Sequence, residues 1–296
     1  MLKQLLGSLF GFRSDSQPCS RLVFDRVKEE GPCREDGIYT INSDGTDCKQ
    51  IYSSQHASCP AWAPDGKWIA FSYSNIHEDK SSILIMDENG DERNRLTIHE
   101  GAGASISSLT WSPDSCRLAY SFHEYVNGKH LEDIFVVNVN NRSKKKLTLS
   151  GENTDVVWTP SNELVFERSL DDDWGKLFVM GPNGENLREF KMLGSNATCP
   201  HWTPNGKKMV FGVSQDNFKK QYFVMNSDGS ERALIPTNSR IRKMIISPDG
   251  QSVAYSTCKG KTFDVFILSL DDGFERRVVA NSNIFSSRDI SWSPVI

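Results

Sequence analysis

The sequence has no apolar run that approaches the 18 residues needed to cross a bilayer, which excludes a transmembrane helix. The apolar stretch near the N-terminus is short and contains Gly7, Ser8 and Gly11. No Ala-x-Ala cleavage site follows it, so it does not match a signal peptide. We expect residues 1–18 to form a separate N-terminal segment, either a short helix or disordered, and residues 19–296 to form a single domain.

Basic residues are not in excess. The 34 Lys and Arg and the 38 Asp and Glu give a formal net charge of −4, whereas a surface that follows a phosphate backbone needs basic charge. A nucleic-acid partner is therefore not expected. The cationic run Lys144–Lys146 is better interpreted as the solvated edge of a strand, because lysine commonly protects strand edges from further pairing.

Paired cysteines are also missing. The seven cysteines are an odd number without any Cys-x-x-Cys, and a chain of 296 residues can build a core without a disulfide framework. Free thiols predict a cytoplasmic location. A periplasmic location and attachment to a membrane surface stay open.

Catalytic signatures are scarce. The sequence has no Gly-x-Ser-x-Gly nucleophile turn, no phosphate-binding Walker loop and no glycine loop for a dinucleotide. We therefore assign no catalytic residue and no metal ligand, and we expect no cofactor. The sequence favours a protein that is not an enzyme but leaves the point open.

What the sequence does contain is an internal repeat. A large apolar residue followed by a Pro-containing turn occurs six times, at Trp62, Trp111, Trp158, Trp202, Ile246 and Trp292. The intervals of 49, 47, 44, 44 and 46 residues suit one four-stranded propeller blade per repeat. Pro sets the backbone angle at the second turn position, and Asp, Asn or Gly accept the remaining angles.

Each repeat predicts four strands. The first ends at the Trp position, the second and third follow at segments such as 69–71 and 83–86, and the fourth follows an Asx-Gly turn, as at 96–97 and 147–148. The first repeat lacks its initial strand, and residues 290–294 supply one at the other end of the chain. We therefore expect an all-β fold, a six-bladed β-propeller of four-stranded blades closed by pairing of the C-terminal strand with the N-terminal blade.

The segments CPAWAPDGKWIAFSYS (59–74) and ILIMDENGDERNRLT (83–97) resemble the repeat of the TolB-like Pro-Asp (WD-like) family of β-propellers. The resemblance covers roughly residues 20 to 296. It implies the fold strongly and the function weakly, because the family includes protein-binding modules, propellers fused to serine peptidases and polysaccharide lyases. The chain ends where the hydrolase domain of such a peptidase would begin.

The two faces of the expected propeller differ in loop length. The turns after each Trp and the Asx-Gly turns lie on one face, and the longer second-to-third-strand and inter-blade loops lie on the other. The long-loop face is the candidate partner-binding surface, although polar residues also gather in exposed loops without a function. Its candidate residues are His56, His77, Glu78, His99, Glu100, His123, Glu124, His130 and Trp174.

A second candidate site is the mouth of the central channel. Residues three positions before each Trp-equivalent should surround it, because the positions two before Trp are mostly apolar and should face the packing side of the same strand. A mouth of this kind usually holds only water. The candidate channel-mouth residues are Cys59, Ser108, Asp155, Cys199, His201, Lys243 and Asp289.

Three functions remain open from the sequence. The first is a monomeric, non-enzymatic scaffold that binds a partner protein through the long-loop face and the channel mouth. The second is a metal-assisted polysaccharide lyase or hydrolase with its site at the channel mouth, where histidine and carboxylate side chains suit a divalent metal. The third is an adaptor tethered to a membrane surface by residues 1–13.

Overall fold

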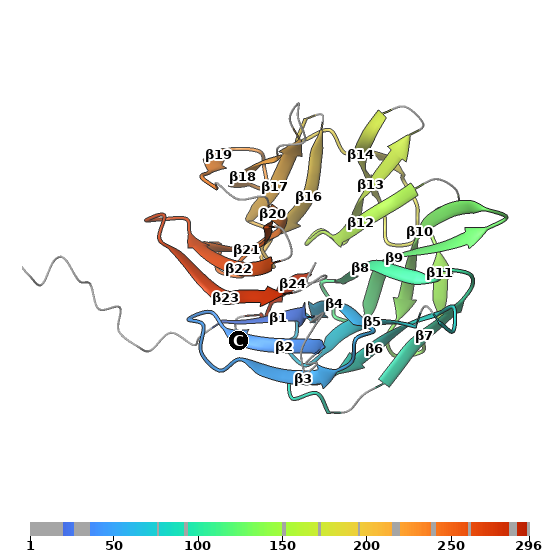
Figure 1. Cartoon of the computed structure of the whole chain (residues 1–296). Coiled ribbons are helices and arrows are strands. Elements are labelled where there is room, and N and C mark those ends of the chain that lie inside the picture. Colours follow the sequence, from blue (N-terminus) through green and yellow to red (C-terminus); the bar gives the residue numbers. More distant parts are fainter. Residues whose placement is uncertain are drawn as a thin grey trace, which may run out of the picture.

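The computed structural model (Figure 1) is all-β in the part of the chain that it describes. The described residues are 20–26, 36–75, 77–91, 94–149, 152–170, 173–194, 196–214, 220–237, 241–259, 262–283 and 289–294. The predicted N-terminal segment 1–18 lies outside them. Within the described ranges, no helix is long and apolar enough to cross a membrane.

Four of the sheets contain four strands each. The sheet that joins the two ends of the described chain has the order β24 (Ile290–Trp292), β1 (Arg21–Arg26), β2 (Gly37–Asn42) and β3 (Lys49–Ser53). The other three follow chain order: β4 (Ala57–Trp62), β5 (Ile69–Asn75), β6 (Lys80–Met86), β7 (Asn94–Glu100); β16 (Ala197–Trp202), β17 (Lys208–Ser214), β18 (Lys220–Asn226), β19 (Ala233–Ile235); β20 (Ile241–Ile246), β21 (Ser252–Lys259), β22 (Thr262–Ser269), β23 (Glu275–Asn283).

The remaining strands form one eight-stranded sheet. It joins two antiparallel groups through a single parallel pair, Glu132 opposite Glu152. The first group is β8 (Ser105–Trp111), β9 (Arg117–Val126), β10 (Lys129–Asn138) and β11 (Lys144–Lys146), and the second is β12 (Glu152–Trp158), β13 (Leu164–Leu170), β14 (Asp173–Met180) and β15 (Arg188–Glu189).

The propeller fold is as the sequence predicts, but the division into six separate blades is not. Among the described residues, four sheets are separate four-stranded blades, and the other two expected blades share one sheet. The reason is local, because the backbone of Glu132 lies close enough to Glu152 to form a bridge between the two groups. β24 pairs with β1, with Leu22 opposite Trp292 and Phe24 opposite Ile290.

The repeated turns have the chemistry that their sequences require. In four of the Pro-containing turns the Asx side chain accepts a hydrogen bond from the backbone two residues later: Asp65 from Lys67 (3.0 Å), Asp114 from Cys116 (2.9 Å), Asn205 from Lys207 (3.0 Å) and Asp249 from Gln251 (2.9 Å). Gly90 has φ +88°, and a Cβ there would lie 2.0 Å from the carbonyl oxygen of Ile51. Only glycine fits this turn, which packs against the preceding blade.

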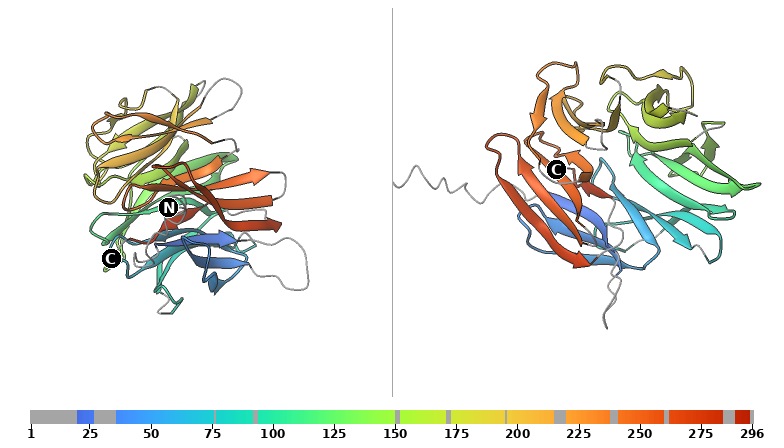
Figure 2. Two further views of the ribbon diagram at one scale, coloured as in Figure 1. Left: turned by 90° about the vertical axis from the view of Figure 1, so that its left-hand side faces the viewer. Right: turned by 45° about the horizontal axis from the view of Figure 1, so that its top comes forward.

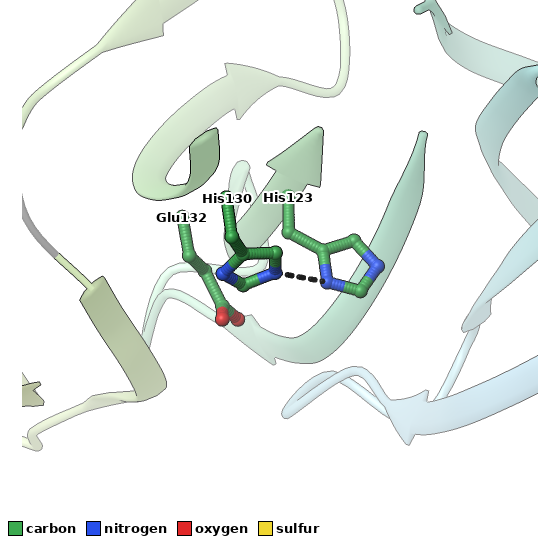
Figure 3. Close-up of side chains that lie close together, drawn as sticks. All are labelled: His123, His130 and Glu132. Carbon is green, nitrogen blue, oxygen red and sulfur yellow. Dashed lines mark hydrogen bonds between the residues drawn. The ribbon is translucent and has the colours of Figure 1, made fainter. Parts of the chain in front are cut away.

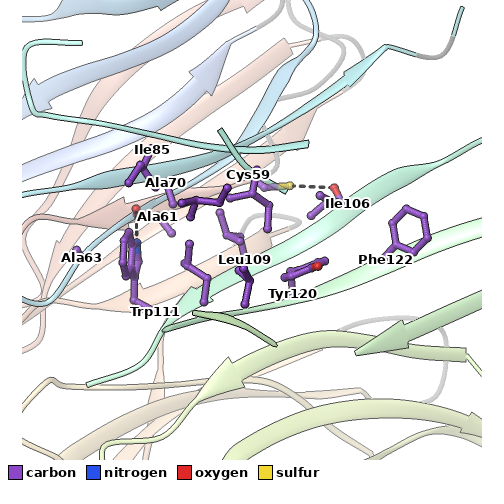
Figure 4. Close-up of a cluster of buried hydrophobic side chains, with 14 of the residues drawn as sticks. Cys59, Ala61, Ala63, Ala70, Ile85, Ile106, Leu109, Trp111, Tyr120 and Phe122 are labelled. Atoms are coloured by element: carbon purple, nitrogen blue, oxygen red, sulfur yellow. Dashed lines mark hydrogen bonds between the residues drawn. The ribbon is translucent and has the colours of Figure 1, made fainter. Parts of the chain in front are cut away.

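The hydrophobic core lies between neighbouring strand groups. The cluster drawn in Figure 4 joins residues of β4–β6 with residues of β8–β10, and Trp111 Nε1 donates a hydrogen bond to the carbonyl oxygen of Ala61 (3.0 Å) across that boundary. A cluster with Leu22, Ile245 and Trp292 joins the last group to the first in the same way. Packing between groups therefore runs around the whole ring seen in Figures 1 and 2.

Two predicted details of the outer strands need correction. Leu147 and Thr148 follow the fourth strand of their group, which is β11. The three residues of β11 are all exposed, in agreement with a solvated strand edge at Lys144–Lys146. His99 is not in an inter-blade loop, because β7 extends to Glu100 and His99 occupies a buried position of that strand.

Candidate functional site

A central cavity of about 750 Å³ is lined by the innermost strand of every strand group. Consecutive residues of these strands, both apolar and polar, line the cavity. The residues two before each Trp-equivalent are buried, as expected of packing residues, but they also line the cavity and do not face only the packing side of the strand: Pro60, Leu109, Val156, Pro200, Met244 and Ile290. The cavity wall is therefore a mixture of apolar side chains and polar or charged side chains.

A β-bulge interrupts each of the innermost strands β4, β8, β12, β16 and β20. Cys59 and Asp155 lie in two of these bulges with φ values of 53° and 50°, which are unusual for residues with a side chain. A bulge re-aims side chains because two residues oppose one on the partner strand.

Most of the predicted channel-mouth residues line this cavity. Ser108 is buried, donates to Ser121 Oγ (2.8 Å) and accepts from the backbone N–H of Val156 (3.3 Å), so it joins two strand groups. Cys59 is buried in the wall, and the side chain of Cys199 lies outside the described residues. The predicted residues that line the cavity are Ser108, Asp155, His201, Lys243 and Asp289.

A charged cluster lies where the two ends of the described chain meet. The Lys243 ammonium forms an ion pair with Asp289, and the backbone N–H of Asp289 donates to Asp25 Oδ1 (3.4 Å). Burial, followed by the charge of Asp289, raises the pKa of Asp25 well above its usual value. The same two causes raise the pKa of the Cys59 thiol. The nearby carboxylate raises the pKa of Lys243 despite the opposing effect of burial.

Two further channel groups are held in defined protonation states. Burial, with a smaller contribution from Lys243, lowers the pKa of His201 to about 3, so its imidazole is neutral. His201 Nδ1 is buried and has no hydrogen-bond partner among the described residues. Asp155 is exposed to the cavity. The protein atoms around it nevertheless restrict its hydration, and this partial burial raises its pKa. The channel therefore presents acidic and neutral groups together with two cationic residues, Arg242 and Lys243.

The structure contradicts the expectation that His99 belongs to a partner-binding face. The side chain is 7% exposed, stacks on Phe122 with ring centroids 4.0 Å apart, and its Nε2 lies 2.8 Å from the hydroxyl oxygen of Tyr120. Burial, followed by the charge of Lys144, lowers its pKa to about 4. His99 is therefore a neutral core residue.

His123 and His130 are likewise not in a loop. They lie on β9 and β10, and the connection between these strands is only Asn127 and Gly128. Register places His123 opposite Glu132 and Tyr125 opposite His130, so these side chains share one face of the hairpin. His130 Nε2 lies 3.3 Å from His123 Nδ1, and the ligand atoms of His123, His130 and Glu132 all lie within 4.8 Å of one another (Figure 3).

Sequence reasoning missed Glu132. Its carboxylate accepts a hydrogen bond from Ser107 Oγ (2.6 Å), and both His123 and Glu132 line the cavity. Burial raises the pKa of Glu132. The signal was present in the Asn127-Gly128 pair, which predicts a two-residue hairpin and hence the pairing of His123 with Glu132.

The other predicted face residues are spread over the strand groups. His56 and His77 lie in the turns before β4 and β6, and His77 and Glu78 are exposed. Glu100 forms an exposed ion pair with Lys80 (3.6 Å), and Glu124 packs against Gly101. The side chain of Trp174 lies outside the described residues. The structure thus brings together His123 and His130 but none of the other predicted histidines.

Comparison with known proteins agrees with this architecture. The family model described as TolB beta propeller domain matches residues 18–296. The chain belongs to the TolB β-propeller family. Tol-Pal system protein TolB of Francisella tularensis subsp. mediasiatica is 24% identical over 242 residues, which are 79% of this chain and 54% of that protein. The chain thus spans about half the length of the curated relatives it matches.

Solved structures support the fold of this TolB-family propeller. TolB from Acinetobacter baumannii has a TM-score of 0.75 at 21% identity, with 98% of this chain and 70% of that chain covered. An oligogalacturonate lyase in complex with manganese has a TM-score of 0.56 at 12% identity, with 90% of this chain and 83% of that chain covered. Identities this low carry the fold and no function.

Proposed function

We propose that this chain is a non-enzymatic interaction propeller that binds a partner protein through its long-loop face and channel mouth. The proposal treats residues 19–296 as one domain and counts the eight-stranded sheet as two blades, so that β24 beside β1 completes a sixth. The pairing of β24 with β1 and the apolar clusters between neighbouring groups support this count.

The observation that carries the proposal is the exposed tip of the β9–β10 hairpin. Tyr125 is 57% exposed and Val126 is 39% exposed, and the hairpin extends beyond its neighbours at the right of Figure 1. Tyrosine is enriched at the centres of protein interfaces, because it buries a large apolar ring and keeps a polar hydroxyl. The turn between the two strands is only Asn127 and Gly128, so no long loop has to become ordered when a partner binds.

The name of the curated relatives, Tol-Pal system protein, supports a protein partner over a small substrate. The relatives give no support to the cytoplasmic location predicted from free thiols, and we carry forward the periplasm or a membrane surface instead. The lyase alternative is not favoured, because the likeness to the lyase extends to the fold alone.

A capture experiment with two matched variants tests the proposal. Y125A/V126S removes the exposed tip of the second-to-third-strand face, whereas F274A removes a side chain that is 60% exposed in the opposite, third-to-fourth-strand face. We expect one specific partner to be captured by the intact chain and by F274A, and to be lost with Y125A/V126S. Capture that survives the hairpin variant and fails with F274A would contradict the proposed face.

A further inference from the structure

Besides the exposed Tyr125 and Val126, the β9–β10 hairpin carries a group of side chains that can bind a metal ion. Histidine and carboxylate groups of one hairpin face converge at the wall of the channel (Figure 3). Two of them, His123 and Glu132, occupy directly opposed positions, and His130 lies diagonally across from His123. Such a set supplies two nitrogen ligands and one oxygen ligand.

The separation of the two imidazoles fits an ion better than it fits a strong hydrogen bond. A separation of 3.3 Å between His130 Nε2 and His123 Nδ1 is at the long limit for a hydrogen bond. Two nitrogens that each bind a tetrahedral zinc ion at about 2.0–2.1 Å lie about 3.3–3.4 Å apart. The observed separation therefore matches one edge of a tetrahedral site.

The groups around the three side chains also have the arrangement of a metal site. Ser107 Oγ donates to Glu132 Oε1 (2.6 Å) and orients the carboxylate. His130 Nδ1 faces Glu152 Oε1 at 4.0 Å, so the second ring nitrogen has a carboxylate nearby. Carboxylates and hydroxyls in this outer position orient the ligands of protein metal sites and increase their basicity.

We propose that His123, His130 and Glu132 bind one divalent transition-metal ion of the zinc class. Two imidazoles and one carboxylate suit zinc and its neighbours more than calcium or magnesium, which prefer oxygen ligands. Because His123 and Glu132 line the cavity, the fourth coordination position faces the channel. The three ligands lie within four residues of the Asn127-Gly128 turn, so the ion links β9 to β10 near the end of the hairpin. It therefore stiffens the segment that carries Tyr125.

Titration of the full chain with zinc, after treatment with a chelator and without any partner protein, tests this inference. We expect one ion per chain by calorimetry, with affinity reduced at least tenfold in H123A and in H130A. The matched control H77A removes an exposed histidine far from the cluster in sequence and should bind zinc as the intact chain does. Circular dichroism and the urea midpoint, measured with chelator present, show that each variant is folded.

A second readout addresses coordination directly. Cobalt(II) bound in place of zinc should give the intense visible absorption of a tetrahedral site in the intact chain and not in H130A. Zinc should also raise the thermal midpoint of the intact chain and leave that of H130A unchanged. Absence of stoichiometric zinc binding, or binding that survives both H123A and H130A, overturns the inference. Neither result depends on whether the chain binds a partner protein.

Discussion

Leu22 of β1 and Trp292 of β24 are paired residues of adjacent antiparallel strands, although they lie near opposite ends of the described chain. The pair belongs to an apolar cluster that also contains Ile245 of the preceding strand group. Because β24 enters a sheet whose other strands come from the N-terminal end, we expect the stability of the fold to depend on this contact.

Truncation of the Trp292 side chain should therefore weaken the whole propeller. The residue is buried, so we expect W292A to lower the free energy of unfolding by about 3 kcal/mol. Urea unfolding followed by circular dichroism measures the loss. The control L149A changes a side chain that is 88% exposed, and it should shift the free energy by less than about 0.5 kcal/mol. Equal effects of the two variants would argue against closure through β24.

The charged cluster beside β24 predicts that substitutions of its two carboxylates, Asp25 and Asp289, change the free energy of unfolding by different amounts. K243M leaves Asp289 without its ammonium partner and should cost about 2–4 kcal/mol, allowing for the partial exposure of the lysine. D289N should destabilise as well, because it leaves the lysine without a counter-ion. D25N should be close to neutral at pH 7, since burial and Asp289 already favour the uncharged form of Asp25.

These three variants can be compared by their urea midpoints at pH 7. A loss for D25N as large as that for D289N would show that Asp25 is ionised in the native protein. The double variant K243M/D289N measures the interaction energy between Lys243 and Asp289. Its loss of unfolding free energy should be smaller than the sum of the losses of the two single variants.

His99 predicts a pH dependence of stability. The ordinary pKa of histidine is 6.5, and the pKa of buried His99 is about 4, so the unfolded chain binds a proton more readily between these values. The contribution of neutral His99 to the free energy of unfolding is fully present above pH 6.5. It falls as the pH drops toward 4, by at most about 3 kcal/mol. H99Q cannot titrate at this position and should reduce the slope of this part of the profile, to which buried His201 also contributes. A profile with the same slope in both proteins would place the proton uptake elsewhere.

The cysteines should differ in reactivity in the native protein. Cys48 is exposed, whereas the Cys59 thiol is buried, lies 3.4 Å from the carbonyl oxygen of Ser107 and has a raised pKa. The thiolate is the reactive form, so alkylation at pH 8 should modify Cys48 and spare Cys59 until urea is added. Peptide mass mapping measures both sites. Rapid native alkylation of Cys59 would mean that the channel wall opens readily.

Much of the fold is predictable because its turns are local. The Pro-Asp-Gly turns and the Asx-Gly pairs set strand ends within a few residues, and Ile69 and Leu164 begin second strands as expected. The single parallel pair between Glu132 and Glu152 was not predictable in this way, since it depends on how two strand groups approach each other.

The candidate site was predictable only in part, for a similar reason. The channel ring follows from a fixed offset to each Trp, whereas burial of His99 depends on how far β7 continues past the expected strand. In β7, Ile98 is exposed and His99 is buried, so alternation carries the histidine inward. To predict that His130 and Glu132 lie close to His123, one would have needed the register of the β9–β10 hairpin.

Site-specific photo-crosslinking tests the central claim, that a partner protein binds the long-loop face. A photoreactive amino acid replaces Tyr125 in one variant and Phe274 in the other, so the probes lie on opposite faces of the same propeller. The account predicts one discrete crosslinked protein from the probe at 125 and none from the probe at 274. Crosslinking from 274 alone, or from neither position, would contradict it.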